Sequence, residues 1–240
     1  MSEIENRNWF KDWAKEYDET LGQNNRHRKL LELMIKSSSA KKNDKILDIG
    51  CGTGLSSLIF LKHVKQCSIT GIDPSPEMVN IFNEKINKLQ LSNIIKCELG
   101  EVKKLSYKDS FFDIVTSTLA LHHIKDKLHT IIKIYHLLKP GGKLVIGDMD
   151  LDATGNINDH KRLLRIMDFF IEDFGYELIN GNLEAFSRSY DYGKRHILKQ
   201  GEYCISFTEW ERLVKEAGFI NIAVEPLPEF KWFKVLTAIK

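Results

Sequence analysis

The sequence predicts an α/β fold in which a doubly wound, mostly parallel β-sheet carries helices on both of its faces. Short apolar runs alternate with helical patterns from Lys45 onward, which is typical of βαβ units. A glycine-rich turn occupies 50–54 directly after the first run, and Asp73 ends the second run. Ligands of such sheets bind beyond the carboxyl ends of the strands, so these two features mark the expected site.

The elements of this alternation follow in chain order from apolar runs, caps and turns. Ser75 and Pro76 open a helix, because serine is a favoured N-cap and proline a favoured first helical residue. The segment 139–142, Lys-Pro-Gly-Gly, ends another helix with a strong turn signal. The predicted strands are 46–49, 68–72, 94–99, 112–117 and 143–147, and helices are predicted at 55–64 and 128–138.

The chain length fits one domain with an insertion. Helical patterns over 9–36 are divided by Gly22, and the stretch after the fifth strand departs from the strand–helix rhythm, with a helix predicted over 157–174 before an aromatic-rich stretch. The predicted divisions are an N-terminal helical cap (1–42), a ligand-binding core (43–150), a helical and aromatic substrate-lid insertion (151–205), and a C-terminal helix with a β-hairpin that completes the sheet (206–240).

The C-terminal region has its own start and stop signals. Thr208 and Glu211 fit a capping box, and Gly218 ends the helix that the box would open. The segments 220–225 and 230–239 are predicted strands, and the short connection between them predicts an antiparallel hairpin.

The bulk composition is that of an ordinary globular protein. The chain has 35 basic and 33 acidic residues, a formal net charge of +2, so nothing in the charge demands a nucleic acid or an anionic membrane. We expect no signal peptide, because residues 1–8 are acidic and polar, and no membrane insertion. The four cysteines form no CxxC pair, so we expect neither a zinc site nor a disulfide framework, but a cytoplasmic protein with reduced thiols.

The glycine turn and Asp73 together predict a nucleoside-binding site. Gly50, Gly52 and Gly54 allow a ligand to approach the backbone closely. A dinucleotide fingerprint requires its third glycine one place later, where Leu55 stands, and a phosphate loop requires a lysine that is absent here. A carboxylate at the end of the second strand can accept hydrogen bonds from ribose hydroxyls.

Five stretches carry a resemblance to class I S-adenosylmethionine-dependent methyltransferases: 46–54, 70–78, 100–105, 112–124 and 138–146. The paired histidines after the fourth strand and the Leu-Lys-Pro-Gly-Gly before the fifth resemble the small-molecule branch that serves ubiquinone and menaquinone biosynthesis. The resemblance implies a Rossmann-like, seven-stranded sheet whose last strand is antiparallel. It also implies S-adenosyl-L-methionine as cofactor and S-adenosyl-L-homocysteine as product.

The resemblance implies roles for individual cofactor-binding residues as well. Those facing the methionine part are Asp48, Gly50, Cys51, Gly52, Thr53 and Gly54. Asp73 is implied to bind the ribose. The residues implied to surround the adenine are Pro74, Met78, Gly100, Glu101 and Val102. Ser117 and Thr118, just past the fourth strand, are implied to lie near the transferred methyl group.

Two groups of titratable residues follow the fourth and fifth strands. His122 and His123 are the candidate general bases, because histidine titrates in the useful pH range. The alternative is a structural role, such as capping a helix or bonding a loop carbonyl. Asp148, Asp150 and Asp152 could hold Mg²⁺, but we favour a solvated strand end and predict no metal site.

The methyl acceptor is not specified by any motif. Aromatic side chains suit a shielded apolar pocket, and the candidate substrate residues are Trp13, Tyr17, Phe170, Tyr190 and Tyr192. Most aromatic residues of these regions are expected to be ordinary core. In relatives, a Tyr-Asp pair near the N-terminus similar to Tyr17 and Asp18 helps to cover the cofactor.

Three functions remain open at this stage. The first is a methyltransferase that acts on O, N or C of a small molecule, with no nucleic-acid partner. The second is an RNA or protein methyltransferase, against which the chain lacks a strongly basic extension. The third is a cofactor-binding protein without transfer chemistry, or a relative that uses a modified S-adenosylmethionine, to whose carboxymethyl-transfer branch the segment 232–236 is similar.

Overall fold

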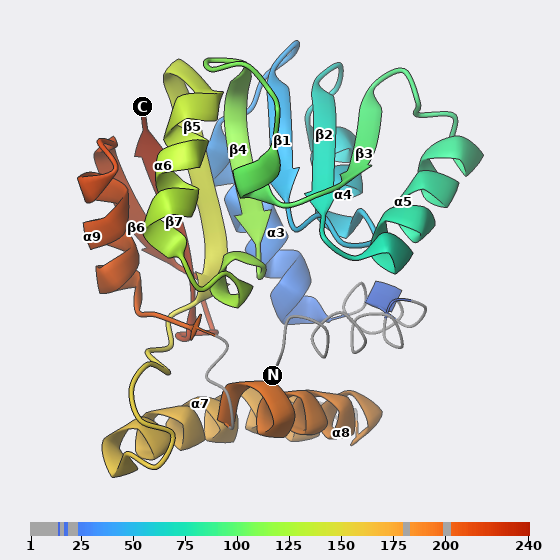
Figure 1. Cartoon of the computed structure of the whole chain (residues 1–240). Helices are drawn as coiled ribbons and strands as arrows, with labels where there is room; N and C mark the ends of the chain where they lie inside the picture. Colours follow the sequence, from blue (N-terminus) through green and yellow to red (C-terminus); the bar gives the residue numbers. More distant parts are fainter. Residues whose placement is uncertain (1–13, 15–16, 19–23, 180–182, 199–202) are drawn as a thin grey trace.

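The structure is a computed structural model that describes residues 14, 17–18, 24–179, 183–198 and 203–240. A seven-stranded sheet in the order β3-β2-β1-β4-β5-β7-β6 forms its centre (Figure 1). The strands are β1 (Lys45–Ile49), β2 (Ser68–Asp73), β3 (Ile95–Leu99), β4 (Phe112–Thr118), β5 (Leu138–Met149), β6 (Ile220–Pro226) and β7 (Phe233–Ile239). Strands β1 to β5 pair in parallel, and β7 is antiparallel to both of its neighbours. The predicted fold class is confirmed.

Helices cover both faces of the sheet (Figure 1). The helices are α3 (Asn25–Ser38), α4 (Leu55–His63), α5 (Pro76–Lys88), α6 (Lys127–Leu137), α7 (His160–Ile179), α8 (Leu183–Tyr192) and α9 (Phe207–Glu216), with short turns η1 (Val102–Lys104) and η2 (Leu121–His123) and a π-helix η3 (Gly193–Leu198). Helices α3, α4 and α5 contribute to one hydrophobic cluster, and α6 and α9 to a second one across the sheet. Each layer therefore buries its own apolar face.

Helix α3 belongs to the layer on the sheet rather than to a separate cap. Its Leu30 and Met34 are fully buried, and a Cβ on Gly147 of β5 would lie 2.3 Å from the Met34 sulfur. A glycine in the strand thus makes room for the methionine. None of the helices within the described residues combines the length and apolar character that crossing a bilayer requires.

The caps decide where two helices begin. The Ser75 hydroxyl accepts the backbone N–H of Met78 at 3.3 Å, as the sequence predicts for α5. For α9 the predicted capping box is wrong by two residues. Ser206, rather than Thr208, is the N-cap, and its hydroxyl accepts the N–H of Glu209 at 3.2 Å. Ser206 and Glu209 are three residues apart, as are Thr208 and Glu211 of the predicted box. The helix therefore begins at the first of the two possible boxes.

Strand β5 is longer than predicted, because the glycine turn at its start joins the sheet. Leu138 already pairs with Phe112, and the register shifts before the parallel ladder continues. Gly141 has a φ of +75°, and its N–H donates to the carbonyl of Lys240 at 3.0 Å. The turn is therefore secured by the end of β7, a partner almost a hundred residues away in sequence.

The predicted insertion is more regular than its composition indicates. It contains α7, α8 and η3, of which the sequence predicted only α7. These elements lie across the edge where the parallel strands end (Figure 1). Buried Arg162 donates to the carbonyls of Ala153, Ile197 and Leu198 at 2.8 to 3.1 Å, which joins η3 to α7. A buried ion pair between Arg26 of α3 and Asp173 of α7 ties this layer to the core.

Candidate functional site

The glycine loop turns back onto strand β2 directly after β1. The backbone N–H groups of Gly50 and Cys51 both donate to the carbonyl of Ile72, at 2.9 and 3.1 Å. Gly50, Gly52 and Gly54 all have positive φ, of 69°, 52° and 88°. A side chain at Gly54 would overlap the ring of Phe82, because its Cβ would lie 2.1 Å away. The loop is therefore a bare backbone surface at the carboxyl edge of the sheet.

Asp73 fixes this loop from the end of β2. One carboxylate oxygen accepts the N–H of Gly52 and the other accepts the N–H of Ser75, both at 2.9 Å. Burial raises the pKa of Asp73 to about 6, although the two N–H donors act in the opposite direction. A carboxylate oxygen has lone pairs for more than one donor, so hydroxyl groups can still bind to it.

Asp48 lies on β1, below the loop, and is only 1% exposed. Its Oδ2 accepts the hydroxyls of Ser56 and Ser57 from the first turn of α4, the latter at 2.6 Å. Its Oδ1 has no hydrogen-bond partner among the described residues. Burial raises the pKa of Asp48 to about 6. A buried acceptor without a donor is the type of atom that a ligand satisfies.

Two residues of the N-terminal segment lie on the glycine loop. The ring of Tyr17 would be 3.8 Å from a Cβ on Gly52, so it covers the loop. Burial, with Asp73 next in effect, raises the pKa of the Tyr17 phenol. Asp18 accepts the Thr53 hydroxyl and forms an ion pair with Lys85 of α5. No sequence motif marks Lys85 as part of the site.

The residues predicted around the adenine come together at the next strand end. The N–H of Gly100 donates to the carbonyl of Asp73 at 3.0 Å, which brings the two turns into contact. Met78 and Val102 are buried, Pro74 is exposed and Glu101 is half-buried. The Glu101 carboxylate lies 2.9 Å from the ammonium of Lys104. This carboxylate is therefore engaged at the surface of the site.

Ser117 and Thr118 lie inside strand β4, not past it as predicted. The Ser117 hydroxyl donates to the carbonyl of Ile49 at 2.9 Å. The Thr118 hydroxyl lies 3.3 Å from the sulfur of Met34. Alternation along the strand sends these side chains to opposite faces of the sheet. Ala120, beyond the strand end, contacts the loop instead, since a Cβ on Gly50 would lie 2.3 Å from the Cβ of Ala120.

The predicted histidines do not share one environment. His122 is buried, and its Nδ1 lies 2.7 Å from Oδ1 of Asp148 on β5. The same oxygen accepts the N–H of Met149 at 2.8 Å. The expectation of a solvated strand end is therefore wrong for Asp148, which is 1% exposed. His123 is half-buried, with its ring centre 4.1 Å from that of His122.

The two following aspartates are structural as well. Asp150 accepts the N–H of Phe207 at 2.7 Å and pairs with Lys234. Asp152 accepts the N–H and hydroxyl of Thr154. No group of three or more His, Cys, Asp or Glu side chains in the described part of the chain is arranged to hold a metal ion.

Lys127 is a buried cation that no sequence motif marks. Its ammonium donates to the carbonyl of Ile124 at 2.7 Å, with the carbonyls of Leu121 and His122 at 3.4 and 3.5 Å. Desolvation by burial lowers the pKa of Lys127 to about 8, although Asp148 acts in the opposite direction. The lysine thus fixes the turn η2 that carries both histidines.

Two of the predicted acceptor residues, Phe170 and Tyr190, contact the ring of Phe174, with ring centres 4.7 and 6.2 Å from it. Phe170 is buried and stacks on Phe174 with ring centres 4.7 Å apart, so it belongs to the core beneath α7. Tyr190 of α8 is 46% exposed. Trp13 and the side chain of Tyr192 lie outside the described residues.

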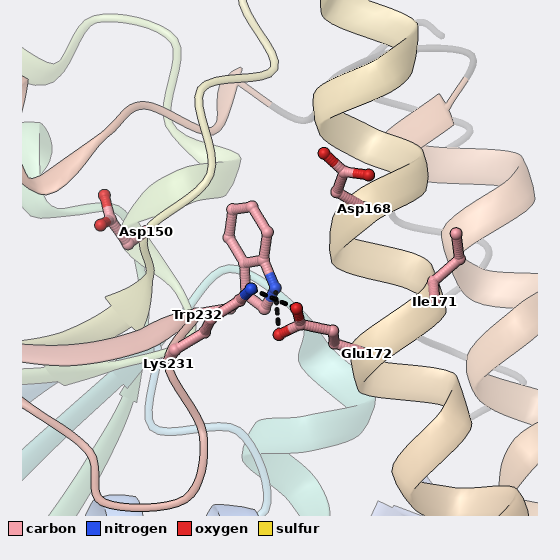
Figure 2. Close-up of a pocket in the computed structure, with 6 residues that line it drawn as sticks. All are labelled: Asp150, Asp168, Ile171, Glu172, Lys231 and Trp232. Carbon is pink, nitrogen blue, oxygen red and sulfur yellow. Dashed lines mark hydrogen bonds and ion pairs between the residues drawn. The ribbon is translucent and has the colours of Figure 1, made fainter.

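A groove of about 400 Å³ opens between α7 and the segment before β7 (Figure 2). It is lined by Asp150, Asp168, Ile171, Glu172, Lys231 and Trp232. Two of its members close one side, because the indole N–H of Trp232 donates to Glu172 at 3.1 Å. The groove is separate from the glycine loop and borders the layer formed by α7.

The fold and the loop define a class of protein: an α/β protein in which a glycine loop and a carboxylate meet at the carboxyl ends of the strands, where sheets of this kind bind their ligands. Residues 47–146 match the family model described as "Methyltransferase domain". This stretch of the chain is therefore similar to methyltransferase domains, as its sequence motifs indicated.

The chain is also similar to curated relatives. The 27-O-demethylrifamycin SV methyltransferase of Amycolatopsis mediterranei is 33% identical over 108 residues, which cover 45% of this chain and 39% of that protein. A demethylmenaquinone methyltransferase of Lactobacillus johnsonii is 28% identical over 220 residues, 89% of this chain and 84% of that protein. The first relatives are matched over only about half of their length or less, from 39% to 52%.

The fold of the whole chain is also similar to solved structures. A SAM-dependent methyltransferase from Aquifex aeolicus superposes with a TM-score of 0.64 at 18% identity, over 95% of this chain and 97% of that one. At this identity the likeness concerns the fold.

Proposed function

We propose that this protein is an S-adenosylmethionine-dependent methyltransferase that methylates O, N or C of a small molecule by in-line displacement. One observation carries the proposal: the Asp73 carboxylate and the Gly52 N–H are joined at the edge of the sheet, at 2.9 Å. The nearby Asp48 Oδ1 is a buried acceptor without a donor among the described residues. Both features suit a ligand that carries ribose hydroxyls and an ammonium group.

We assign each part of the cofactor to a different group of residues around the loop. We assign the ribose to Asp73 and the methionine part to Asp48 and the loop 50–54. We assign the adenine to the surface formed by Met78 and by the 100–102 turn. The absence of side chains on the three loop glycines supports this assignment, because the cofactor can then lie on the backbone.

The bound cofactor supplies an electrophilic methyl group on a sulfonium. The protein has to align the acceptor with the carbon–sulfur bond and keep water out, and alignment of this type is worth roughly 7–11 kcal/mol in favourable cases. Tyr17 covers the loop, and its neighbour Asp18 fastens it there through Thr53 and Lys85. This cover supports a shielded site.

We propose His122 as the base that accepts the acceptor's proton, with His123 beside it. A carboxylate only accepts hydrogen bonds, so the contact with Asp148 assigns the proton of neutral His122 to Nδ1. The remaining nitrogen, Nε2, is then the basic one. In this assignment Asp148 is a positioning residue, and Lys127 holds the turn that carries the ring.

We propose a small-molecule acceptor rather than RNA or protein. The formal charge of +2 offers no strongly basic surface for a phosphate backbone, and the relatives named above are small-molecule methyltransferases by name. The four free thiols support a cytoplasmic location. An unmodified cofactor is part of the proposal, and a modified one is the alternative.

The test is calorimetry of the purified protein with S-adenosylmethionine, S-adenosylhomocysteine and NAD, followed by transfer of a labelled methyl group to a panel of phenols, amines and acidic carbon compounds. We expect saturable binding of the two adenosyl compounds and label in at least one small molecule. Binding of NAD alone would overturn the assignment. Mass spectrometry of the copurified ligand distinguishes a modified cofactor, and transfer to RNA or protein alone would favour the second function.

A further inference from the structure

Two thiols that are 46 residues apart in sequence meet beside the glycine loop. The sulfur of Cys51, within the loop, lies 3.8 Å from the sulfur of Cys97, the middle residue of β3. Strand β2 separates their backbones, and its Gly71 pairs with Cys97 in the parallel ladder. The two side chains therefore reach across the same position of the sheet.

A glycine creates the space in which the sulfurs meet. A Cβ on Gly71 would lie 2.8 Å from the Cys51 sulfur and 3.1 Å from the ring of Phe82. Any larger residue at 71 would separate the thiols or displace the loop. Cys51 is 4% exposed, whereas Cys97 is half-buried. An oxidant in solution therefore meets Cys97 first.

We propose that Cys51 and Cys97 form an oxidisable dithiol site, and that a disulfide between them weakens cofactor binding. The oxidant is hydrogen peroxide. It oxidises the Cys97 thiol to a sulfenic acid and is reduced to water. The Cys51 sulfur then attacks the Cys97 sulfur, and the sulfenic hydroxyl leaves with the Cys51 thiol proton as a second water molecule. The effect on the cofactor rests on the proposed function.

The loop must move when the bond forms. A disulfide requires about 2.05 Å between the sulfurs, so the pair closes by roughly 2 Å. The Cys51 backbone donates to Ile72 and accepts the N–H of Gly54 at 2.9 Å, and its neighbour Gly52 donates to Asp73. With Gly71 and Phe82 crowding the Cys51 sulfur, part of the movement falls on this backbone. The groups assigned to the ribose then lose their alignment.

In the reduced protein the Cys51 thiol has low reactivity. Burial, with Cys97 next in effect, raises the pKa of the Cys51 thiol. A protonated thiol is a poor nucleophile, so Cys51 does not react with other electrophiles in solution, and its reaction with Cys97 depends on the short distance between the two sulfurs. The remaining cysteines, Cys67 and Cys204, are buried and take no part in this contact.

The experiment uses the full chain, reduced and then treated with hydrogen peroxide. Trypsin places the cysteines in four different peptides, 46–62, 66–85, 97–103 and 200–212, so a non-reducing peptide map identifies every pairing. Calorimetry with S-adenosylhomocysteine is run on the reduced, oxidised and re-reduced protein. The variants are Cys97→Ala, with Cys97→Ser as a second form that keeps a polar atom, and Cys204→Ala as the matched control.

We expect a 46–62 to 97–103 disulfide and at least about tenfold weaker binding, restored by a thiol reductant. Cys204→Ala should behave like the parent, and both Cys97 variants should keep their affinity in peroxide. A map without this disulfide, or a disulfide with unchanged affinity, overturns the proposal. If the reduced protein fails to bind the adenosyl compound, the proposed function and the effect on binding both fall, whereas the map still decides the pairing.

Discussion

The carboxylate of Asp73 accepts the N–H of Gly52 at 2.9 Å, which joins the end of strand β2 to the turn after strand β1. Its second oxygen accepts the N–H of Ser75, the N-cap of α5. One buried side chain thus positions the loop and the start of a helix. It also has lone pairs left for the ribose hydroxyls that we propose it binds.

Replacement Asp73→Asn should weaken the binding of S-adenosylhomocysteine by roughly thirtyfold, since a hydrogen bond to a charged group is worth about 2 kcal/mol. The amide keeps one acceptor but directs an NH₂ group toward a donor. Calorimetry measures the loss, and exposed Asp168→Asn, on α7, is the matched control. Equal affinities for the two variants would contradict the assignment of the ribose.

The free energy of unfolding should depend on pH because of two buried carboxyl groups, those of Asp48 and Asp73. The pKa values of Asp48 and Asp73 are both raised to about 6 by burial. The folded state therefore binds protons between about pH 6 and pH 4 that the unfolded chain does not bind. From these groups the apo protein gains stability as pH falls through this window, roughly 3 kcal/mol for each carboxyl, and loses it as pH rises through 6.

His27 acts in the opposite direction, because burial lowers its pKa to about 4, so its contribution is lost as pH falls from 6.5 toward 4. The test is therefore a difference between variants. Urea unfolding of Asp48→Asn and of the parent should show a stability difference that changes between pH 7 and pH 5. Cofactor affinity should fall as the pH is lowered from 7 to 5, because the two carboxylates become protonated. A difference in stability independent of pH would argue against the raised pKa of Asp48.

Gly54→Ala should destabilise the protein and impair binding. Gly54 has a φ of +88°, and an added Cβ would lie 2.1 Å from the ring of Phe82. Backbone strain and overpacking together cost roughly 3 kcal/mol. Gly175→Ala, in helix α7, is the control, because a Cβ added there would have no neighbour within 4 Å. Alanine in place of glycine should stabilise the helix by about 0.5–1 kcal/mol. In thermal unfolding, the midpoint temperature should fall for Gly54→Ala and rise for Gly175→Ala.

Asp148→Asn should lower turnover far more than cofactor affinity if His122 accepts the acceptor's proton. The loss expected from a misplaced base is of the order of 10²–10⁴-fold, and the pH–rate profile should shift with it. His129 and Asp126 provide the matched control, because the same Nδ1 to carboxylate contact occurs there at 2.9 Å on the surface. If Asp126→Asn and Asp148→Asn have equal turnover, the buried pair has only a structural role.

The fold was predictable where neighbouring residues decide the local structure. The N-cap Ser75 and the glycines of the 50–54 loop act within a few residues, so their patterns are visible in one dimension. Helix α8 was missed because its Ser- and Tyr-rich sequence has no recognised cap, and packing stabilises it: Phe186 lies against Phe174 of α7, ring centres 6.1 Å apart. Tertiary contacts of that kind leave no local pattern.

The site was predictable to the same extent. The loop and Asp73 are adjacent strand ends, which any parallel βαβ unit brings together. The contact between His122 and Asp148 depends on the register of β4 against β5, which is not readable from spacing. The same holds for Lys85, whose ion pair with Asp18 depends on where the N-terminal segment lies. Long-range pairing of polar groups is a product of the folded geometry.

The layer of α7, α8 and η3 is built from residues outside 47–146, the stretch that carries the family match. It is fastened to the rest through side-chain contacts such as that between Asp173 and Arg26. Natural variation can therefore change this layer while the residues to which we assign the adenosyl group stay unchanged. Exchanging this layer between relatives should change which compound is methylated and leave the affinity for the methyl donor unchanged.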